Sequence, residues 1–342
     1  MKKKNYAAID VAKYVSALLV VCIHTYPLYD LSPAANTFLI QAICRIAVPF
    51  FFVVSAFLFF SKIDPAAGMR DALNLGMLKH YLRRLALLYG AWSVIYLPYT
   101  FLLWCGDGFS LTFLLRWIFD CFFNGSYYHL WFLPALMLGT LIVYVLYTNV
   151  SLRRGMLVTA ILYAIGMGMN VYGSVLAQIP FVASLYQLYM SVFTTARNGI
   201  FFAPVFLYVG IYLKAYPNVY DKKEYALGIA SFYGALLLEE GLAYACGVLQ
   251  DLTSMYLMLV PFTYFLVGAL LQVQRTPSYL CRFLRQSSLL IYVSHILFAM
   301  PLLALFPDHH LLVYGAVIVC AQLLAVVIIA LSNRFSWLKV LC

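Results

Sequence analysis

The chain has 342 residues, of which 65% are hydrophobic and only 10% are charged, and its mean hydropathy is +0.91. A soluble domain has about 25% charged and about 45–50% apolar residues, so this composition excludes an ordinary soluble protein and predicts one that crosses a membrane repeatedly. The net charge of +10 does not indicate nucleic-acid binding, because basic residues in a membrane chain collect in its cytoplasmic loops.

Ten apolar segments are long enough to cross a hydrocarbon core of about 30 Å. They are Ala8–Leu28, Thr37–Phe60, Leu82–Cys105, Leu130–Tyr147, Met156–Tyr172, Ile200–Leu213, Tyr225–Leu249, Met255–Val273, Ser288–Phe306 and Leu311–Leu331. The sixth segment is short, and its helix is expected to extend into neighbouring residues. The predicted fold is all-α, a polytopic membrane bundle of about ten transmembrane helices. It forms a single domain over residues 1–342, without a soluble domain.

Basic residues predict the orientation of this bundle. Ten spans place both termini on one side, and a cytoplasmic N-terminus leaves 19 of the 22 Lys and Arg residues in cytoplasmic segments. This distribution meets the positive-inside rule and predicts a multi-pass cell-membrane protein with both termini cytoplasmic. Arg45 in the second span, Arg116 in an outer amphipathic segment and Arg197 at the outer start of the sixth span are the exceptions. Arg116 is expected to snorkel to the headgroups.

The first span carries three ionisable residues, Asp10, Lys13 and His24. Ionisable groups at membrane depth are candidates for function. Ten residues separate Lys13 from His24, which is about 16 Å along a helix. His24 is either an interfacial histidine bonded to a carbonyl or a general base, for which its unperturbed pKa near 6.5 is suited. Asp10 and Lys13 are either functional or a cytoplasmic anchor paired at i, i+3.

Further polar residues lie in or beside other spans. Arg45 precedes Pro49 by one turn, and Pro49 is expected to loosen the helix. The guanidinium of Arg45 beside this loosened backbone could bind an anion or a carbonyl; the alternative is a buried ion pair with a carboxylate of another helix. Glu239 and Glu240 point about 100° apart on the seventh span. They are expected to relay protons, to pair with an arginine, to orient His24, or to form a structural pair.

Histidines occur at three other places near the spans. His129 adjoins Tyr127, Tyr128 and Trp131 in an expected outer aromatic belt, and His295 lies in the ninth span. His309 and His310 are expected to face solvent. No nucleotide, hydrolase or zinc-protease motif is present, and no metal site is expected.

The first span resembles the opening helix of the acyltransferase-3 family, membrane enzymes that pass acyl groups, usually acetyl from acetyl-CoA, to extracytoplasmic sugars or other polymers. In that family ten residues separate an Arg from a His that is considered catalytic; Lys13 occupies the position of the Arg and His24 that of the His. Other similar blocks are Arg45–Phe59, with Ala56 in place of the usual Gly, Lys79–Tyr89, His129–Leu133 and Ser288–His295.

Within the family, Tyr128–Leu136 and Ala196–Gly210 are similar to blocks in the membrane half of the vancomycin-resistance (VanT-type) serine racemases. In those proteins the membrane half is thought to supply serine, and a soluble racemase half follows it. This chain is therefore expected to be such a membrane module without the racemase, or a stand-alone relative.

The resemblance implies an acyltransferase of groups other than aminoacyl groups, with acyl-CoA as a cytoplasmic donor and no tightly bound cofactor. His24 would be the general base and Arg45 would position the acyl carbonyl. Lys13, Arg83 and Arg84 would meet the phosphates of CoA, although Lys cannot reproduce the bidentate contact of an Arg. The acceptor would be a cell-wall or surface glycan or a small molecule. The expected substrate-side residues are Arg197, His129, Trp131, Glu239, Glu240 and His295.

The alternative function is a membrane module that transports serine or another small amino acid for cell-wall precursor synthesis. In that case Arg45 or Arg197 binds the carboxylate and Glu239 or Glu240 binds the ammonium. A separate racemase or an extracytoplasmic protein would be its partner, besides the lipid bilayer. A scaffold or an inactive family member is the third alternative.

Overall fold

The computed structural model describes residues 6–107, 110–176, 178–193, 195–248, 255–273 and 278–342. The regular secondary structure in these ranges is helical, without a strand, which confirms the predicted all-α class. Eight of the described helices are long and apolar enough to cross a membrane. They are Ala7–Thr25, Pro33–Phe60, Ala72–Gly106, Tyr128–Asn149, Leu152–Asn170, Lys222–Ala245, Tyr279–Leu305 and His310–Arg334.

Two shorter apolar helices, Ala203–Ala215 and Leu259–Gln272, lie where the sixth and eighth spans are predicted. The count of ten spans and the orientation of the termini stay predictions.

The chain divides into two compact units. The first comprises Met1–Phe51, Tyr220–Ala226 and Phe265–Cys342, and the second comprises Phe52–Val219 and Leu227–Tyr264. Three helices contribute to both units: α3 (Ala47–Phe60), α11 (Lys222–Ala245) and α12 (Leu259–Gln272). That residues 1–342 form a single domain stays a prediction.

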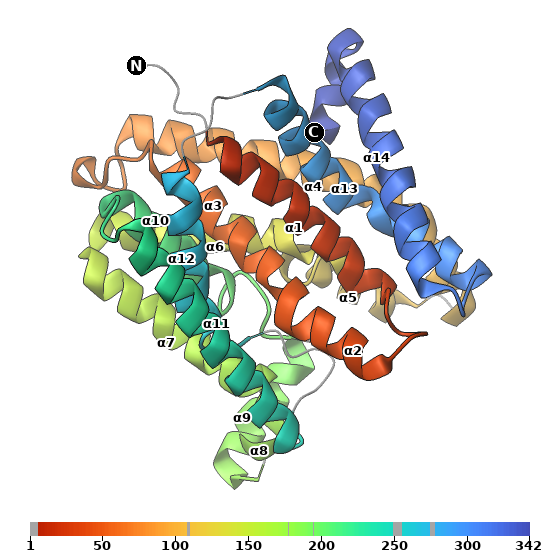
Figure 1. The fold of residues 1–342 in the computed structure, drawn as a ribbon, viewed down its shortest axis with the longest axis horizontal. Helices are drawn as coiled ribbons and strands as arrows, with labels where there is room; N and C mark the ends of the chain where they lie inside the picture. Colours follow the sequence, from red (N-terminus) through yellow and green to blue (C-terminus); the bar gives the residue numbers. More distant parts are fainter. Residues whose placement is uncertain (1–5, 108–109, 177, 194, 249–254, 274–277) are drawn as a thin grey trace. The chain divides into compact units, whose positions relative to one another are not determined.

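In the first unit, α1 (Ala7–Thr25) packs against α13 (Tyr279–Leu305) and α14 (His310–Arg334), and these two also pack against each other. Figure 1 shows the red α1 alongside the two blue helices. The face of α14 that carries Val313, Val317, Ala321 and Ala325 is completely buried. Small residues one turn apart allow neighbouring membrane helices to approach closely, which explains why α14 fits against its partners.

The segment after α1 is a broken helix. It begins with α2 (Pro33–Phe38), continues as a π-helix at Leu39–Ile43 and a 3-10 turn at Cys44–Ile46, and becomes regular again in α3. Pro49 cannot donate a backbone N–H to the carbonyl four residues earlier. The 3-10 turn at Cys44–Ile46 thus lies directly before Pro49, beside the place where the sequence predicts a loosened helix, and the π-helix lies further upstream.

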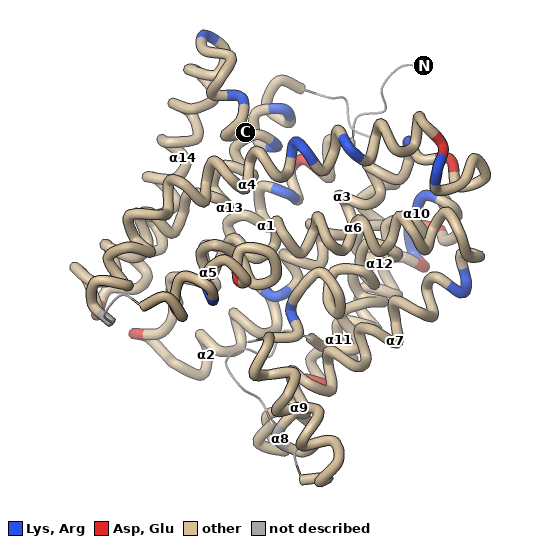
Figure 2. Tube along the Cα trace, turned by 180° about the vertical axis from the view of Figure 1, so that it is seen from behind, with Lys and Arg blue, Asp and Glu red and all other residues tan. Residues whose placement is uncertain are grey.

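Apart from Arg45, the basic residues described in the first unit gather toward one end of its helices. Figure 2 shows the blue Lys and Arg positions toward the end where α1 begins and α14 ends. This end also holds the short 3-10 helix Ser336–Leu341, which includes Lys339. A one-sided charge distribution within this unit agrees with the positive-inside pattern.

The second unit is built around α10 (Ala203–Ala215), whose residues from Ala203 to Ile211 are all buried. It packs against α6 (Phe132–Asn149) and α7 (Leu152–Asn170). The long α4 (Ala72–Asp107) packs against α6. A 3-10 turn at Pro65–Ala67 and the short α8 (Gly173–Leu176) complete its connections.

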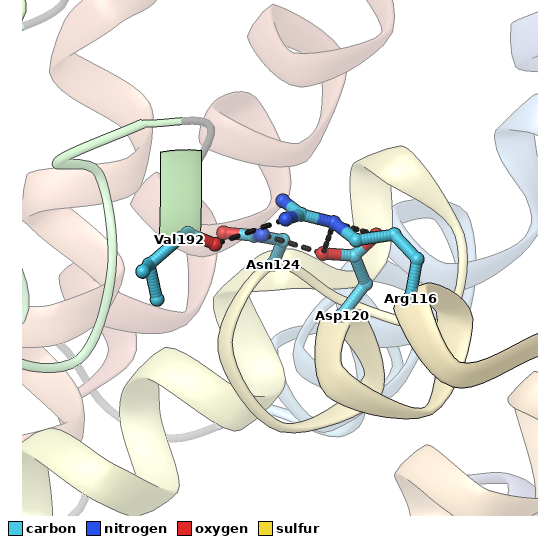
Figure 3. Close-up of polar contacts among 4 residues, drawn as sticks. All are labelled: Arg116, Asp120, Asn124 and Val192. Carbon is cyan, nitrogen blue, oxygen red and sulfur yellow. Dashed lines mark hydrogen bonds and ion pairs between the residues drawn. The ribbon is translucent and has the colours of Figure 1, made fainter. Parts of the chain in front are cut away.

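Two further helices of this unit, α5 (Leu111–Phe123) and α9 (Pro180–Val192), are joined by one arginine. Arg116 Nη1 donates to the carbonyl of Val192 at 3.0 Å, and its Nε lies 3.2 Å from the Asp120 carboxylate. Asn124 Nδ2 donates to the same carboxylate at 2.7 Å. Figure 3 shows Arg116 between the Val192 carbonyl and the Asp120 carboxylate, which Asn124 also contacts. Arg116 therefore binds protein groups, whereas snorkelling to the headgroups is predicted for it.

Candidate functional site

Two histidines from opposite ends of the sequence meet in the first unit. His24 lies in the last turn of α1 and His295 near the middle of α13, and their ring centroids are 5.2 Å apart with an interplanar angle of 35°. His295 is completely buried, whereas His24 is half-buried. The pair brings the predicted general base into contact with a residue that is expected on the substrate side.

Helices α1 and α13 run in the same direction. At their other end Asp10 lies 3.5 Å from Arg285 of α13, and Lys13 is within electrostatic range of both charges. The fourteen residues from Asp10 to His24 span about 21 Å of helix. A charged cluster and a histidine pair therefore mark the two ends of one helix–helix interface.

Polar side chains continue between these two ends. Tyr14 of α1 donates to Gln322 Oε1 of α14 at 3.0 Å, and Gln322 Nε2 donates to Ser287 Oγ of α13 at 3.2 Å. We call Asp10, Tyr14, Ser287, Gln322 and the histidine pair the polar seam. Satisfied polar groups between packed membrane helices fix how the helices associate, and the seam lines the face of α1 that carries His24.

The protonation of His295 follows from its neighbours. Its Nδ1 lies 2.8 Å from the carbonyl oxygen of Tyr292 and 3.1 Å from that of Ile291. A carbonyl oxygen only accepts, so these contacts assign the proton of the neutral ring to Nδ1 and leave Nε2 as the acceptor. The same contacts hold the ring in place against His24.

Arg45 lies in the 3-10 turn of the broken segment, which packs against α1. Its Nε donates to Gln41 Oε1 at 3.1 Å, and its side chain is half-buried. The thiols of Cys22 on α1 and Cys44 on the turn are close neighbours. These two cysteines precede His24 by two residues and Arg45 by one, so the two predicted catalytic residues lie on backbone segments that touch.

A third histidine at this end is not solvent-exposed as expected. His310 begins α14; its Nδ1 donates to the carbonyl of Thr25 at 2.8 Å, and its backbone N–H donates to Asp30 at 2.6 Å. His309 beside it is exposed. His310 thus ties α14 to the residue that follows His24. Sequence spacing could not reveal this contact, because 285 residues separate its partners.

The two adjacent glutamates belong to the second unit and differ in environment. Both carboxylate oxygens of Glu239 accept backbone N–H groups, from Leu257 at 2.7 Å and Met258 at 2.9 Å, directly before α12 begins. Glu240 is buried, with 8% of its surface exposed, and lies within electrostatic range of Tyr233. Glu239 therefore caps a helix, whichever further role it has.

Arg197 and Trp131 are in contact in the second unit. The guanidinium carbon of Arg197 lies 5.5 Å from the centroid of the Trp131 ring, a cation–π geometry. Trp131 belongs to the 3-10 turn Tyr128–Trp131, which also carries His129. His129 is 2% exposed and packs edge-on against Tyr96 with centroids 4.8 Å apart. His129 is thus a buried part of an aromatic cluster.

The loop that carries Arg197 is held by Asn198, which the sequence did not single out. Asn198 is completely buried; its Oδ1 accepts the backbone N–H groups of Ile200 and Phe201 at 2.9 and 3.1 Å. Its Nδ2 donates to the hydroxyl of Tyr189, which donates to the Thr195 carbonyl. Burial raises the pKa of Tyr189 to about 12, so this hydroxyl keeps its proton at neutral pH.

The two arginines predicted to meet CoA lie on α4 of the second unit and are both exposed. Arg83 lines a surface groove together with Lys79, whereas Arg84 lies within electrostatic range of Tyr81. The candidate residues therefore form two groups. Lys13, His24, Arg45 and His295 belong to the first unit; Arg83, Arg84, His129, Trp131, Arg197, Glu239 and Glu240 belong to the second.

Comparison with known families assigns the chain as a whole. The family described as "Acyltransferase domain" (acyltransferase 3) matches residues 6–331. The chain belongs to the acyltransferase-3 family. The match includes both units, the polar seam and every predicted site residue. No solved structure matches the chain.

Curated relatives of this acyltransferase-3 protein are named racemases. An amino-acid racemase of Enterococcus faecalis is 33% identical over 271 residues, which are 79% of this chain and 36% of the relative. A serine/alanine racemase of Enterococcus gallinarum is 29% identical over 272 residues, 80% of this chain and 38% of the relative. The chain thus spans about a third of the length of the curated relatives that it matches.

Proposed function

We propose that this acyltransferase-3 protein moves an acyl group, such as acetyl, from cytoplasmic acyl-CoA to an extracytoplasmic or membrane-embedded acceptor, such as a cell-wall or surface glycan. The observation that carries the proposal is the contact between His24 and His295 at the end of the polar seam, within a chain-long family match. Ionisable groups buried in a membrane bundle are costly, and they mark sites of chemistry or transport.

In the proposed reaction His24 acts as general base. It takes the proton of an acceptor hydroxyl, whose oxygen forms a bond to the thioester carbonyl carbon, and the carbon–sulfur bond then breaks. The proton passes from His24 to the departing thiolate, so that free CoA and an ester are the products. Arg45 would bind the carbonyl oxygen as negative charge develops there. His295, fixed by two backbone carbonyls, would keep the His24 ring in position.

The test uses the purified full-length chain in proteoliposomes with acetyl-CoA labelled in the acetyl group. Loss of label from the thioester is measured for the wild type, His24→Ala, His24→Gln and, as a matched control, His309→Ala at an exposed histidine. General-base catalysis contributes about 10²- to 10⁴-fold, so both His24 variants should lose at least about 100-fold in rate while the control keeps it. Consumption of acetyl-CoA that is equal in wild type and His24→Ala would refute the proposal.

A second candidate function has a specific observation in its favour. The relatives are named amino-acid and serine/alanine racemases, and the region that this chain shares with them includes a cation, Arg197, held over Trp131. A guanidinium in such a position can bind a carboxylate bidentately. We propose, as the alternative, that the chain carries serine or a similar amino acid across the membrane.

Uptake of labelled serine by proteoliposomes without acyl-CoA separates the two functions. Transport predicts uptake that Arg197→Gln reduces at least tenfold and that Arg153→Gln, which removes a charge from an exposed position, leaves unchanged. Uptake that is equal in all three proteins would exclude this role for Arg197.

A further inference from the structure

An apolar groove opens on the surface of the second unit, along α4 and α6. Its volume is about 630 Å³. The floor consists of aliphatic side chains from both helices: Leu75, Leu78, Leu82, Ala86, Met137 and Leu141. From Leu75 to Ala86 the groove follows eleven residues of α4, which is about 16 Å. A cleft of this length and composition fits a hydrocarbon chain.

Two cations complete the lining of this groove. Lys79 and Arg83 are one helical turn apart on α4, so their charged ends are neighbours. Both residues are exposed. The eight lining residues include these two cations and no acidic residue. The groove is therefore complementary to an amphiphile with a hydrocarbon chain and an anionic head.

The orientation expected from the sequence places this site on the inner side of the membrane. Lys79 precedes the third predicted span and Arg83 is the second residue of that span, at its expected cytoplasmic end; the positive-inside rule places basic residues there. Anionic phospholipids of the cytoplasmic leaflet attract basic residues at that depth, with about 1 kcal/mol for each Lys or Arg.

We propose that this groove binds an anionic phospholipid of the cytoplasmic leaflet, with one acyl chain along the aliphatic floor and the phosphate between Lys79 and Arg83. The site shares no residue with the polar seam and does not depend on the proposed transferase activity. It assigns Arg83 to a lipid phosphate, whereas the family resemblance implies that Arg83 meets CoA.

Native mass spectrometry of the purified full-length chain in detergent tests the proposal. The chain is titrated with phosphatidylglycerol and with phosphatidylcholine of the same acyl chains. We expect a phosphatidylglycerol adduct that the double variant Lys79→Gln/Arg83→Gln weakens about 30-fold, because each basic residue contributes about fivefold. The control Arg153→Gln/Arg154→Gln removes the same charge from exposed positions of α7 and should leave the adduct unchanged.

A second variant blocks the groove without removing a charge. Ala86→Phe places a large ring in the floor of the groove. Ala86 is exposed, so the larger side chain should not prevent folding. The variant should weaken the adduct although both cations remain. Equal binding of the two lipids by the wild type, or an adduct that neither the charge variant nor the filled groove affects, would overturn the assignment. Displacement of the phosphatidylglycerol adduct by equimolar long-chain acyl-CoA would reassign the groove to the acyl donor.

Discussion

Gly210 of α10 is the position where a single methyl group should disturb the second unit most directly. A Cβ atom built there would lie 2.4 Å from the carbonyl oxygen of Val53, 2.8 Å from Ala56 Cβ and 2.8 Å from the backbone nitrogen of Phe57. Two of these atoms belong to the backbone of α3, which cannot move away as a flexible side chain can. Ordinary contact begins near 3.4 Å, so α3 and α10 would have to separate by about 1 Å, which is the difference between 3.4 and 2.4 Å.

The expected cost of Gly210→Ala follows from this displacement. Overpacking costs about 1–3 kcal/mol, and the better helix propensity of alanine returns less than about 1 kcal/mol. We expect the free energy of unfolding to fall by about 2 kcal/mol. Reversible SDS unfolding of the purified chain in mixed micelles, followed by circular dichroism, measures this change.

The matched control is Gly90→Ala on α4, where nothing lies within 4 Å of the added Cβ. This variant should be as stable as the wild type or slightly more stable. Ala56 stands where the family usually has Gly, and Ala56→Gly combined with Gly210→Ala should regain only part of the loss, since the two backbone contacts remain. A Gly210→Ala variant within about 0.5 kcal/mol of the Gly90→Ala control would refute the close packing of α3 and α10.

Three further changes test other contacts by the same unfolding measurement. Gly125→Ala should lower the free energy of unfolding by at least about 2 kcal/mol, because Gly125 has a φ of 94° and an added Cβ would lie 2.6 Å from the backbone nitrogen of Trp131. The control is Gly68→Ala, which has a φ of 83° but open space around the added Cβ, so that it measures the cost of backbone strain alone. Glu239→Ala should lower the free energy of unfolding by about 2 kcal/mol, because two backbone N–H groups lose their acceptor; Glu239→Gln should lower it by about half as much, because only one loses its acceptor. Equal stability of the two variants would contradict the role of Glu239 as a cap. Asp10→Asn should cost only about 1 kcal/mol, because Arg285 is 42% exposed, and the loss should shrink in high salt.

The resemblance and the spacing of Lys13 and His24 identified the family and the first helix of the candidate site. Pro49 indicated the loosened helix, because the missing N–H of a proline acts on the preceding turn wherever the helix lies. Glu239 illustrates the opposite case. A glutamate in a predicted span suggested a chemical role, but in the structure its carboxylate caps α12. That helix begins 20 residues later, so no local sequence pattern could predict this cap.

Composition and the alternation of apolar and basic segments were sufficient to assign an all-helical membrane protein, because the bilayer requires each span to satisfy its own backbone and leaves basic residues outside the core. Because consecutive spans cross the membrane in opposite directions, the first and ninth spans were also expected to run in the same direction. Only the tertiary structure decided that α1 and α13 are neighbours, that His24 therefore meets His295, and that Tyr14 reaches Gln322. Side-chain contacts between helices depend on the shape and packing of their surfaces, which hydropathy and charge along the chain do not specify.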